Sequence, residues 1–183
     1  MDFKLVLEKL LTAFKEQDIR YALMGGFAMG AWGAPRATVD IDFLVLRDDM
    51  EKVDAIMRSL SYECKHQTEN VSQYVSPLQV FGEVDFLHAF RTPSLSMLQR
   101  AEDRNMFGET IFVKVLKIED LIGFKAQAIA NNRERTTVDL ADIEVLINTH
   151  KSNIDWSLIE EYFVLFGLND MFKELRRKYG DNQ

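Results

Sequence analysis

The stretch that decides the fold runs from residue 21 to residue 46 and reads YALMGGFAMGAWGAPRATVDIDFLVL. It begins with a short apolar run, Tyr21–Met24, followed directly by Gly25 and Gly26. It ends with Val39–Leu46, which is rich in Val, Ile, Leu and Phe. Short apolar runs bounded by turn residues are typical of buried strands. We therefore expect two strands, joined through a glycine turn and a short apolar helix over residues 27–32.

Two acidic residues interrupt the second of these strands. Asp40 and Asp42 are two positions apart, so their side chains project from the same face of a strand. Neighbouring carboxylates repel each other and are costly to bury unless a cation lies between them. Hard divalent ions, Mg²⁺ first and Mn²⁺ second, prefer oxygen ligands of this kind. The spacing therefore predicts a metal site on this strand.

A third acid lies farther along the chain, in a segment that is otherwise suited to a core. Asp85 stands in the middle of an expected strand over residues 79–88. If that strand lies beside the strand of Asp40 and Asp42, three carboxylates converge. Such a site could clamp the oxygens of a phosphoryl transfer, and Asp85 could accept the proton of an attacking hydroxyl. The alternative is that Asp85 caps a turn or pairs with an arginine.

The residues that precede the acids suggest a phosphate-binding loop. Gly25 and Gly26 permit positive φ and a close approach of backbone amides to an anion, although such a pair can also simply form a tight turn. Arg36 and Thr38 lie just before Asp40. Arg36 would either contact a triphosphate or brace the loop by binding a carboxylate. Neither of the common glycine-rich nucleotide fingerprints is present.

The remaining pattern predicts strands and helices first and helices alone later. After about residue 117 the apolar period is 3.6 throughout, which favours an α+β class with a C-terminal helical bundle. We expect an α/β core over residues 1–116 and a helical region over residues 117–183. The other expected helices cover residues 2–17, 48–60 (capped by Asp48 and Asp49), 93–100, 118–131, 138–149, 155–166 and 169–178, and the other strands cover residues 110–116 and, more weakly, 62–76.

Composition and charge limit the class of protein. A net charge of −7 argues against a protein that coats nucleic acid by charge alone. The single cysteine, Cys64, excludes an internal disulfide framework and fits a reducing compartment. The first residues show no secretory signal, so we expect a cytoplasmic protein. The apolar run over residues 22–34 is shorter than the ~20 residues needed to span a bilayer, so no membrane association is expected.

These residues together carry a resemblance. The glycine pair, the pattern Arg36-x-Thr38-x-Asp40-x-Asp42 and the later Asp85 resemble the nucleotidyltransferase superfamily. The closest likeness is to small prokaryotic proteins akin to the nucleotidyltransferase toxins of abortive-infection systems. The resemblance implies a nucleotidyltransferase-like mixed sheet with flanking helices, in which Gly25 and Gly26 hold the phosphates of the nucleotide. It also implies that the three acids bind Mg²⁺.

The helical part adds a softer likeness to the same group. Lys125, followed by Arg133 or Arg135 and then by Asp139 and Asp142, resembles a Lys…Arg…Asp-x-x-Asp pattern. By that likeness Lys125 reaches the nucleotide phosphates and Asp139 lies close by. From the residues alone, Lys125 could equally be a solvated side chain of its helix, and the two aspartates could cap or solvate the next one.

The expected reaction moves a nucleoside monophosphate from a nucleoside triphosphate to a hydroxyl acceptor, which is RNA, protein or a small molecule. Arg36, Thr38, Lys125 and Asp139 would contact the nucleotide. A toxin–antitoxin component with a cognate antitoxin is one biological setting for this activity. The alternative is a non-catalytic module on the same fold that binds a nucleotide or a partner protein. The chain departs from the family in having Gly26 where serine is frequent, and in lacking a large C-terminal acceptor domain.

Overall fold

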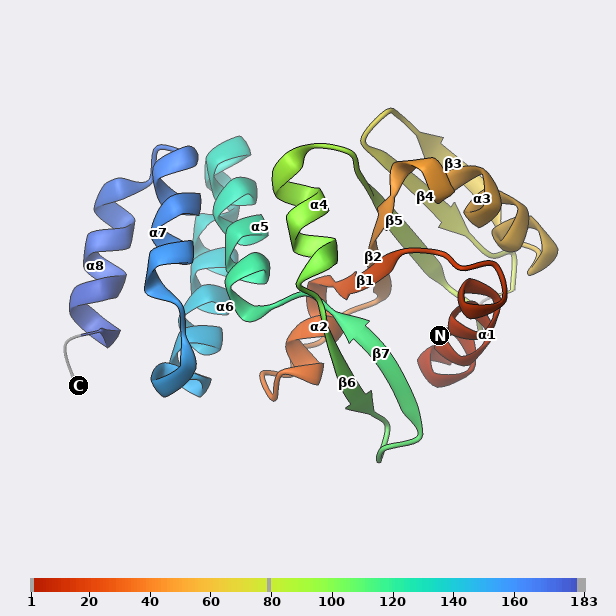
Figure 1. Cartoon of the computed structure of the whole chain (residues 1–183), viewed down its shortest axis with the longest axis horizontal. Helices are drawn as coiled ribbons and strands as arrows, with labels where there is room; N and C mark the ends of the chain where they lie inside the picture. Colours follow the sequence, from red (N-terminus) through yellow and green to blue (C-terminus); the bar gives the residue numbers. More distant parts are fainter. Residues whose placement is uncertain (1, 79, 181–183) are drawn as a thin grey trace. The chain divides into compact units, whose positions relative to one another are not determined.

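A computed structural model of the chain describes residues 2–78 and 80–180 (Figure 1). The chain divides into two compact units. The first contains the chain up to Ala31 and again from Pro35 to Leu116, and it holds all the strands described. The second contains Trp32–Ala34 and the chain from Lys117 onward, and its regular elements are helical. The expected α+β class with a C-terminal helical bundle is confirmed.

One mixed sheet forms the centre of the first unit. Its strand order is β3-β4-β5-β2-β1-β7-β6. Strand β2 pairs antiparallel with β1 and parallel with β5, and β1 pairs parallel with β7. The central position of β2 places its two acids between neighbours on both sides. The strand bounds are β1 Tyr21–Met24, β2 Asp40–Leu46, β3 Glu63–Gln67, β4 Val71–Val75, β5 Glu83–Ala89, β6 Glu102–Met106 and β7 Ile111–Val115.

The aromatic core fixes how the sheet packs. Phe14 of helix α1 (Phe3–Glu16) lies 5.4 Å from the ring of Phe43 on β2 and 6.3 Å from that of Phe86 on β5. The Phe43 and Phe86 rings stack at 5.8 Å, and all three side chains are fully buried. Burying one phenylalanine of this kind contributes about 1.5–3 kcal/mol. Because side chains alternate along a strand, Asp42 and Asp85, each next to one of these phenylalanines, project from the opposite face.

The other helices of the first unit are short. Helix α2 (Gly25–Ala31) follows β1 without an intervening loop, so both glycines form its first turn. Helix α4 (Thr92–Gln99) packs against β2 and β5. Helix α3 (Met50–Ser59) follows a 3₁₀ turn, Arg47–Asp49. Asp49, one of the two predicted capping residues, does occupy the N-cap position of α3, but its side chain makes no capping hydrogen bond. Its carboxylate instead accepts a hydrogen bond from the backbone N–H of Arg20 at 3.1 Å.

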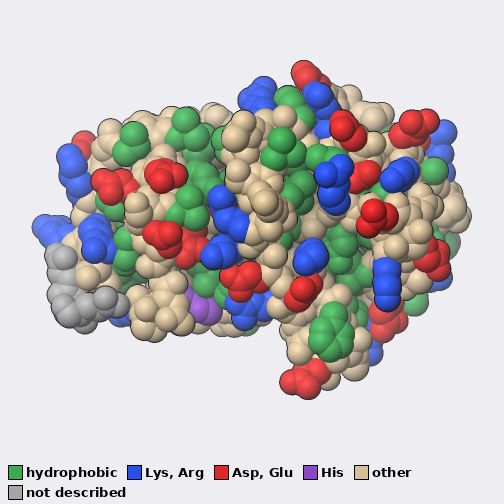
Figure 2. All heavy atoms as spheres, in the orientation of Figure 1, with side chains coloured by type: hydrophobic (Ala, Val, Ile, Leu, Met, Phe, Trp, Pro, Cys, Tyr) green, Lys and Arg blue, Asp and Glu red, His purple; other side chains and the backbone are tan. Residues whose placement is uncertain are grey.

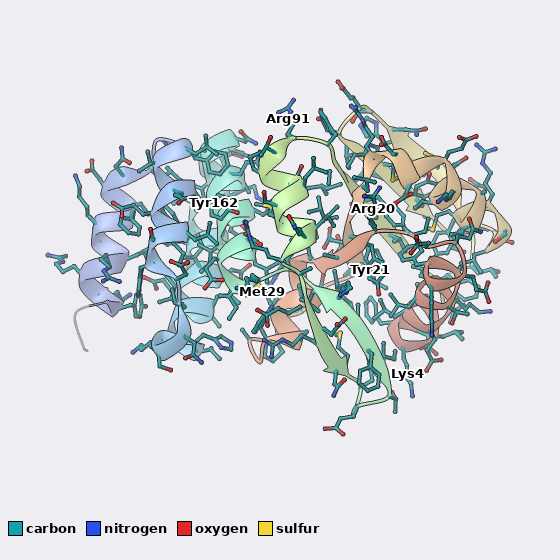
Figure 3. All side chains as sticks on the ribbon, viewed as in Figure 1. Lys4, Arg20, Tyr21, Met29, Arg91 and Tyr162 are labelled. Atoms are coloured by element: carbon teal, nitrogen blue, oxygen red, sulfur yellow. The ribbon has the colours of Figure 1, made fainter. Side chains whose placement is uncertain are left out.

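The helical unit has its own buried contacts. Tyr162, labelled in Figure 3, donates its hydroxyl to the Oδ1 atom of buried Asp120 at 2.6 Å. A Cβ atom at Gly123 would lie 2.7 Å from the Tyr162 ring, so only glycine lets the ring pack at that point. The carboxylate of Asp155 caps the helix that carries Tyr162. The helices are α5 Ile118–Asn131, α6 Thr136–Thr149, α7 Trp156–Leu165 and α8 Asn169–Tyr179, with short 3₁₀ turns at Arg133–Arg135 and Lys151–Asn153.

One strand is shorter than predicted, and another was not predicted. The strand expected over residues 79–88 begins only at Glu83, because the chain turns before it and Phe81 donates its backbone N–H to the carbonyl of Leu78. Gln79 itself lies outside the described residues. Strand β6 was not expected, because its sequence, Glu-Asp-Arg-Asn-Met, has little strand preference. It forms by antiparallel pairing with β7 and is an edge strand, where charged residues are common.

Acidic and basic side chains are intermingled on the face drawn in Figure 2, and no large patch of one charge is seen there. Among the described helices, none is both long and apolar enough to cross a membrane.

Candidate functional site

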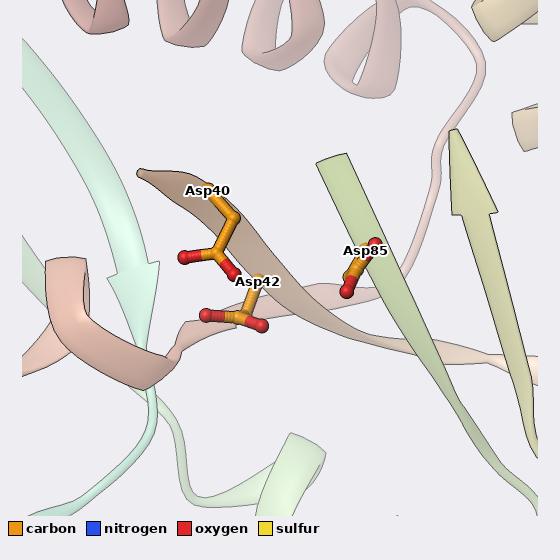
Figure 4. Close-up of side chains that lie close together, drawn as sticks. All are labelled: Asp40, Asp42 and Asp85. Carbon is orange, nitrogen blue, oxygen red and sulfur yellow. The ribbon is translucent and has the colours of Figure 1, made fainter. Parts of the chain in front are cut away.

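Sheet register brings the three predicted acids together. In the parallel pairing of β2 with β5, Asp42 lies directly opposite Asp85, and Asp40 lies opposite Glu83. Each of Asp40, Asp42 and Asp85 is partly buried. One carboxylate oxygen from each can be chosen so that all three atoms lie within 4.8 Å of one another (Figure 4). The alternative in which Asp85 caps a turn does not fit its position in the middle of β5.

This donor set fits a divalent cation. Three carboxylates on one face of a sheet supply hard oxygen ligands and concentrate negative charge, which a bound Mg²⁺ or Mn²⁺ would neutralise. Burial raises the pKa of Asp85 above its usual value, and the neighbouring carboxylates of Asp40 and Glu83 raise it further. The side chain of Gln73 acts in the opposite direction by donating a hydrogen bond, from Nε2 to Asp85 Oδ2 at 3.1 Å.

The carboxylate of Asp40 is held by a local contact. The hydroxyl of Thr38 donates a hydrogen bond to Asp40 Oδ1 at 2.7 Å. Thr38 was expected to contact the nucleotide, and the structure places it where it orients an acid. Arg36 is exposed, and its Nη1 atom lies 3.5 Å from the carbonyl oxygen of Ala37.

The glycine pair fits closely against the acid site. Gly25 has a φ of +66°, and a Cβ atom there would lie 1.9 Å from Asp42 Oδ2. A Cβ atom at Gly26 would lie 2.7 Å from the Cβ atom of Thr38. The missing side chain of Gly25 therefore leaves room for the Asp42 carboxylate. That of Gly26 leaves room for Thr38, which orients Asp40. Both are in addition to any contact of the glycine backbone with a phosphate.

The predicted residues of the helical unit form a cluster of four charges. Lys125 is buried, and its Nζ atom donates hydrogen bonds to Asp139 Oδ1 at 3.3 Å and to a carboxylate oxygen of Asp142. Arg135 donates to both oxygens of Asp139, at 2.8 and 3.3 Å. Burial by itself would raise the pKa of Asp139, but Arg135 and Lys125 together hold that pKa below its usual value. The structure thus rules out a solvated Lys125, and it places Arg135 rather than Arg133 against Asp139.

Replacing Lys125 with methionine should destabilise the protein. The change removes a cation shared by two carboxylates of low exposure, and breaking a buried pair in this way costs about 3–5 kcal/mol. Urea unfolding followed by far-UV circular dichroism measures the loss. Lys173→Met is the matched control, because Lys173 and its partner Asp170 are both exposed on α8. Equal stability of the two variants would contradict a structural role for the cluster.

Sequence reasoning missed the residues that orient the acids. Gln73 lies on β4, in a stretch where only weak strands were expected, and it is exposed and unremarkable in the sequence. The contact between Thr38 and Asp40 spans two residues, and the side-chain oxygen of a threonine just before an acid could have suggested it. For Gln73 the sequence holds no comparable signal, because its contact depends on the pairing of β4 with β5.

Comparison with known proteins identifies what the chain is similar to. A family model described as an uncharacterised nucleotidyltransferase matches residues 3–177. Comparison with curated protein sequences gives no match.

Several solved structures share the fold at low sequence identity. The solution structure of the antibiotic-resistance factor ANT(2'')-Ia is 15% identical, with a TM-score of 0.67 over 97% of this chain and 99% of that one. A nucleotidyltransferase-like antigenic protein from Paracoccidioides brasiliensis is 17% identical, with a TM-score of 0.58 and coverages of 96% and 92%. The lincomycin-bound lincosamide adenylyltransferase LnuA is 14% identical, with a TM-score of 0.56 and coverages of 77% and 94%.

Proposed function

The chain belongs to the family of uncharacterised nucleotidyltransferases, and on this basis we propose that it transfers a nucleoside monophosphate from a nucleoside triphosphate to a hydroxyl group. The observation that carries this proposal is the convergence of Asp40, Asp42 and Asp85 at one place on the sheet. Three carboxylates on neighbouring strands are costly to keep together unless a cation and its phosphate ligands are to bind there.

Asp40, Asp42 and Asp85 would hold Mg²⁺ or Mn²⁺. Such an ion, when bound, stabilises the negative charge that builds up on the phosphate oxygens during transfer. The three side chains are presented by two adjacent strands, each of which pairs with a neighbour on both sides, so their positions are set before the substrate arrives. Preorganisation of this kind is where most of the electrostatic stabilisation in an active site comes from.

Asp85 is the proposed general base. Its raised pKa favours proton uptake more than that of an ordinary aspartate does. In the proposed step, an acceptor hydroxyl oxygen forms a bond to the α-phosphorus while the bond from that phosphorus to the bridging oxygen breaks. The hydroxyl proton passes to Asp85, and pyrophosphate leaves with the electron pair of the broken bond.

The remaining predicted residues would hold the nucleotide. We assign the backbone of Gly25 and Gly26 to the phosphates, with Arg36 and Thr38 at the edge of the same loop. Lys125 and Asp139 stay proposed contacts from the helical unit. Lys125 already binds two carboxylates, so it would have to exchange one of them for a phosphate oxygen.

The acceptor and the setting belong to the same proposal. Small hydroxylated molecules are the first acceptor class to test, because ANT(2'')-Ia is described in complex with adenylyl-2''-tobramycin and LnuA with lincomycin. RNA and protein are the other two classes. A cytoplasmic location fits a nucleoside triphosphate substrate and a single cysteine. A toxin role would appear as growth arrest on expression that a neighbouring antitoxin gene relieves.

The direct test supplies each of the four α-labelled nucleoside triphosphates with Mg²⁺ and one acceptor class at a time. Transfer of label to RNA, protein or a small molecule, with release of pyrophosphate, supports the proposal and identifies the acceptor. Thermal stabilisation by a nucleotide with Mg²⁺ but without labelled product would favour the non-catalytic binding module.

The charge of Asp85 should make stability depend on pH and on metal. Because its pKa is raised in the folded state, the folded protein binds more protons than the unfolded one just above the unfolded pKa of about 3.9. Its contribution to stability is therefore present at lower pH and lost as the pH rises through the folded pKa. Metal-free Asp85→Asn should melt higher than the unchanged protein at pH 7, with a smaller difference at pH 4.

Melting curves with and without Mg²⁺ complete this measurement. The ion should raise the Tm of the unchanged protein, because it relieves the repulsion among the acids, and it should raise that of Asp85→Asn less. An Asp85→Asn variant that melts lower than the unchanged protein at pH 7 without metal would contradict the expected sign.

A further inference from the structure

We infer that Gln73 is a positioning residue that holds the Asp85 carboxylate in place for the shared acid site. The inference rests on the proposed function and goes beyond it, since Gln73 belongs neither to the acids nor to the expected nucleotide contacts. The observation behind the inference is the place of Asp85 in the sheet. It lies between the amide of Gln73 on β4 and the carboxylate of Asp42 on β2.

The register makes this arrangement direct. In the antiparallel pairing of β4 with β5, Gln73 lies opposite Asp85, and in the parallel pairing of β5 with β2, Asp85 lies opposite Asp42. Side chains that are directly opposite on neighbouring strands are close enough to interact. The Gln73 amide uses that closeness to donate to Asp85 Oδ2 at 3.1 Å. The contact holds one oxygen of the carboxylate, Oδ2, and so restricts the orientation of the group that is shared with Asp40 and Asp42.

The chemistry of the donor suits this task. Asp85 lies near the carboxylates of Asp40 and Glu83, so an arginine or lysine at position 73 would form an ion pair and compete with a bound cation. A neutral amide orients the carboxylate without cancelling its charge. The contact of Thr38 with Asp40 follows the same rule, since a neutral hydroxyl orients that acid. Groups that orient metal ligands in this way typically change metal affinity or activity by about 10–100-fold when they are removed.

The test compares Gln73→Met with Gln67→Met. Methionine keeps the length of the glutamine side chain and removes its hydrogen-bond donor. Gln67 is an exposed glutamine on the adjacent strand β3, so its variant controls for the loss of a surface amide in the same sheet. The direct readout is Mn²⁺ affinity, measured from the electron paramagnetic resonance signal of the free ion. Gln73→Met should weaken binding by about 10-fold, whereas Gln67→Met should bind like the unchanged protein.

Kinetics separate positioning from a general structural effect. Gln73→Met should lower kcat by about 10-fold at fixed Mg²⁺, with KM for the nucleotide little changed, and excess Mg²⁺ should restore part of the loss. Gln73→Met should melt close to the unchanged protein, because position 73 is exposed.

The outcomes are distinguishable. Mn²⁺ binding by the unchanged protein with equal affinity in Gln73→Met would overturn the role of Gln73 and leave the proposed function standing. Absence of any Mn²⁺ binding by the unchanged protein would overturn both. Weaker binding that appears equally in Gln67→Met would also count against Gln73, because it would show a general effect of altering the sheet surface.

Discussion

Asp42→Asn is expected to reduce nucleotidyl transfer by roughly 10³-fold or more, because it removes charge from the centre of the acid site. Asp42 is next to two other predicted parts of the site, the acid Asp85 and the glycine Gly25. It lies opposite Asp85 on β5, and its carboxylate lies against Gly25. The side chain keeps its size, so packing is preserved. Initial rates with the labelled nucleotide that supports transfer, taken at several Mg²⁺ concentrations, measure the loss.

The stability of Asp42→Asn should not fall with its activity. Removing one of three neighbouring negative charges relieves repulsion, so metal-free Asp42→Asn should melt at the same temperature as the unchanged protein or higher. Asp48→Asn is the matched control, because Asp48 is an exposed aspartate just beyond the end of the same strand. Full transfer activity in Asp42→Asn would defeat the proposed mechanism, and loss of activity together with unfolding would leave only a structural role.

Gly25→Ala is expected to damage both stability and activity. A Cβ atom at this position would lie 1.9 Å from Asp42 Oδ2, and φ is +66°, so the variant is strained and the carboxylate has to move. The strain in φ alone costs about 1–2 kcal/mol. A displacement of about 1 Å in an active site can cost 10²-fold in rate, so we expect a loss of that order in transfer. Urea unfolding and initial rates measure the two effects.

A second glycine separates the two causes. Gly108, in the turn between β6 and β7, has a φ of +67°, and nothing lies within 4 Å of the place that a Cβ atom would take. Gly108→Ala therefore carries the backbone strain without the collision. It should lose only the about 1–2 kcal/mol of the backbone strain, less than Gly25→Ala, and keep its activity. If Gly25→Ala is as active as Gly108→Ala, the close fit between Gly25 and Asp42 does not contribute to the rate of transfer.

The local pattern was a good guide to the elements. The apolar run before the glycines predicted β1, the apolar run that contains the acids predicted β2, and the two-residue spacing of Asp40 and Asp42 predicted their common face. The 3.6-residue period after residue 117 predicted the helices of the second unit. These features follow from residues that are neighbours along the chain. Burial of one face and the conformational preference of a short segment are enough to set them.

Local reasoning failed where a residue has a distant partner. The capping role expected of Asp49 gave way to the backbone of Arg20, and the burial of Lys125 depends on acids from the next helix. Strand β6 has little preference of its own and forms against β7. In each case the winning contact comes from another element, and no window of a few residues contains both partners.

The sequence by itself therefore determined which residues are acidic, which lie on a strand, and that Asp40 and Asp42 share a face. Only the tertiary structure decided that Asp85 lies opposite Asp42 on β2 and that Gln73 contacts Asp85 from β4, the other neighbour of β5. The physical reason is that cross-strand register is a property of the whole sheet. It is fixed by the pairing of β2, β5 and β4 and by the aromatic rings packed beneath them, and a shift of one residue would turn every acid to the opposite face.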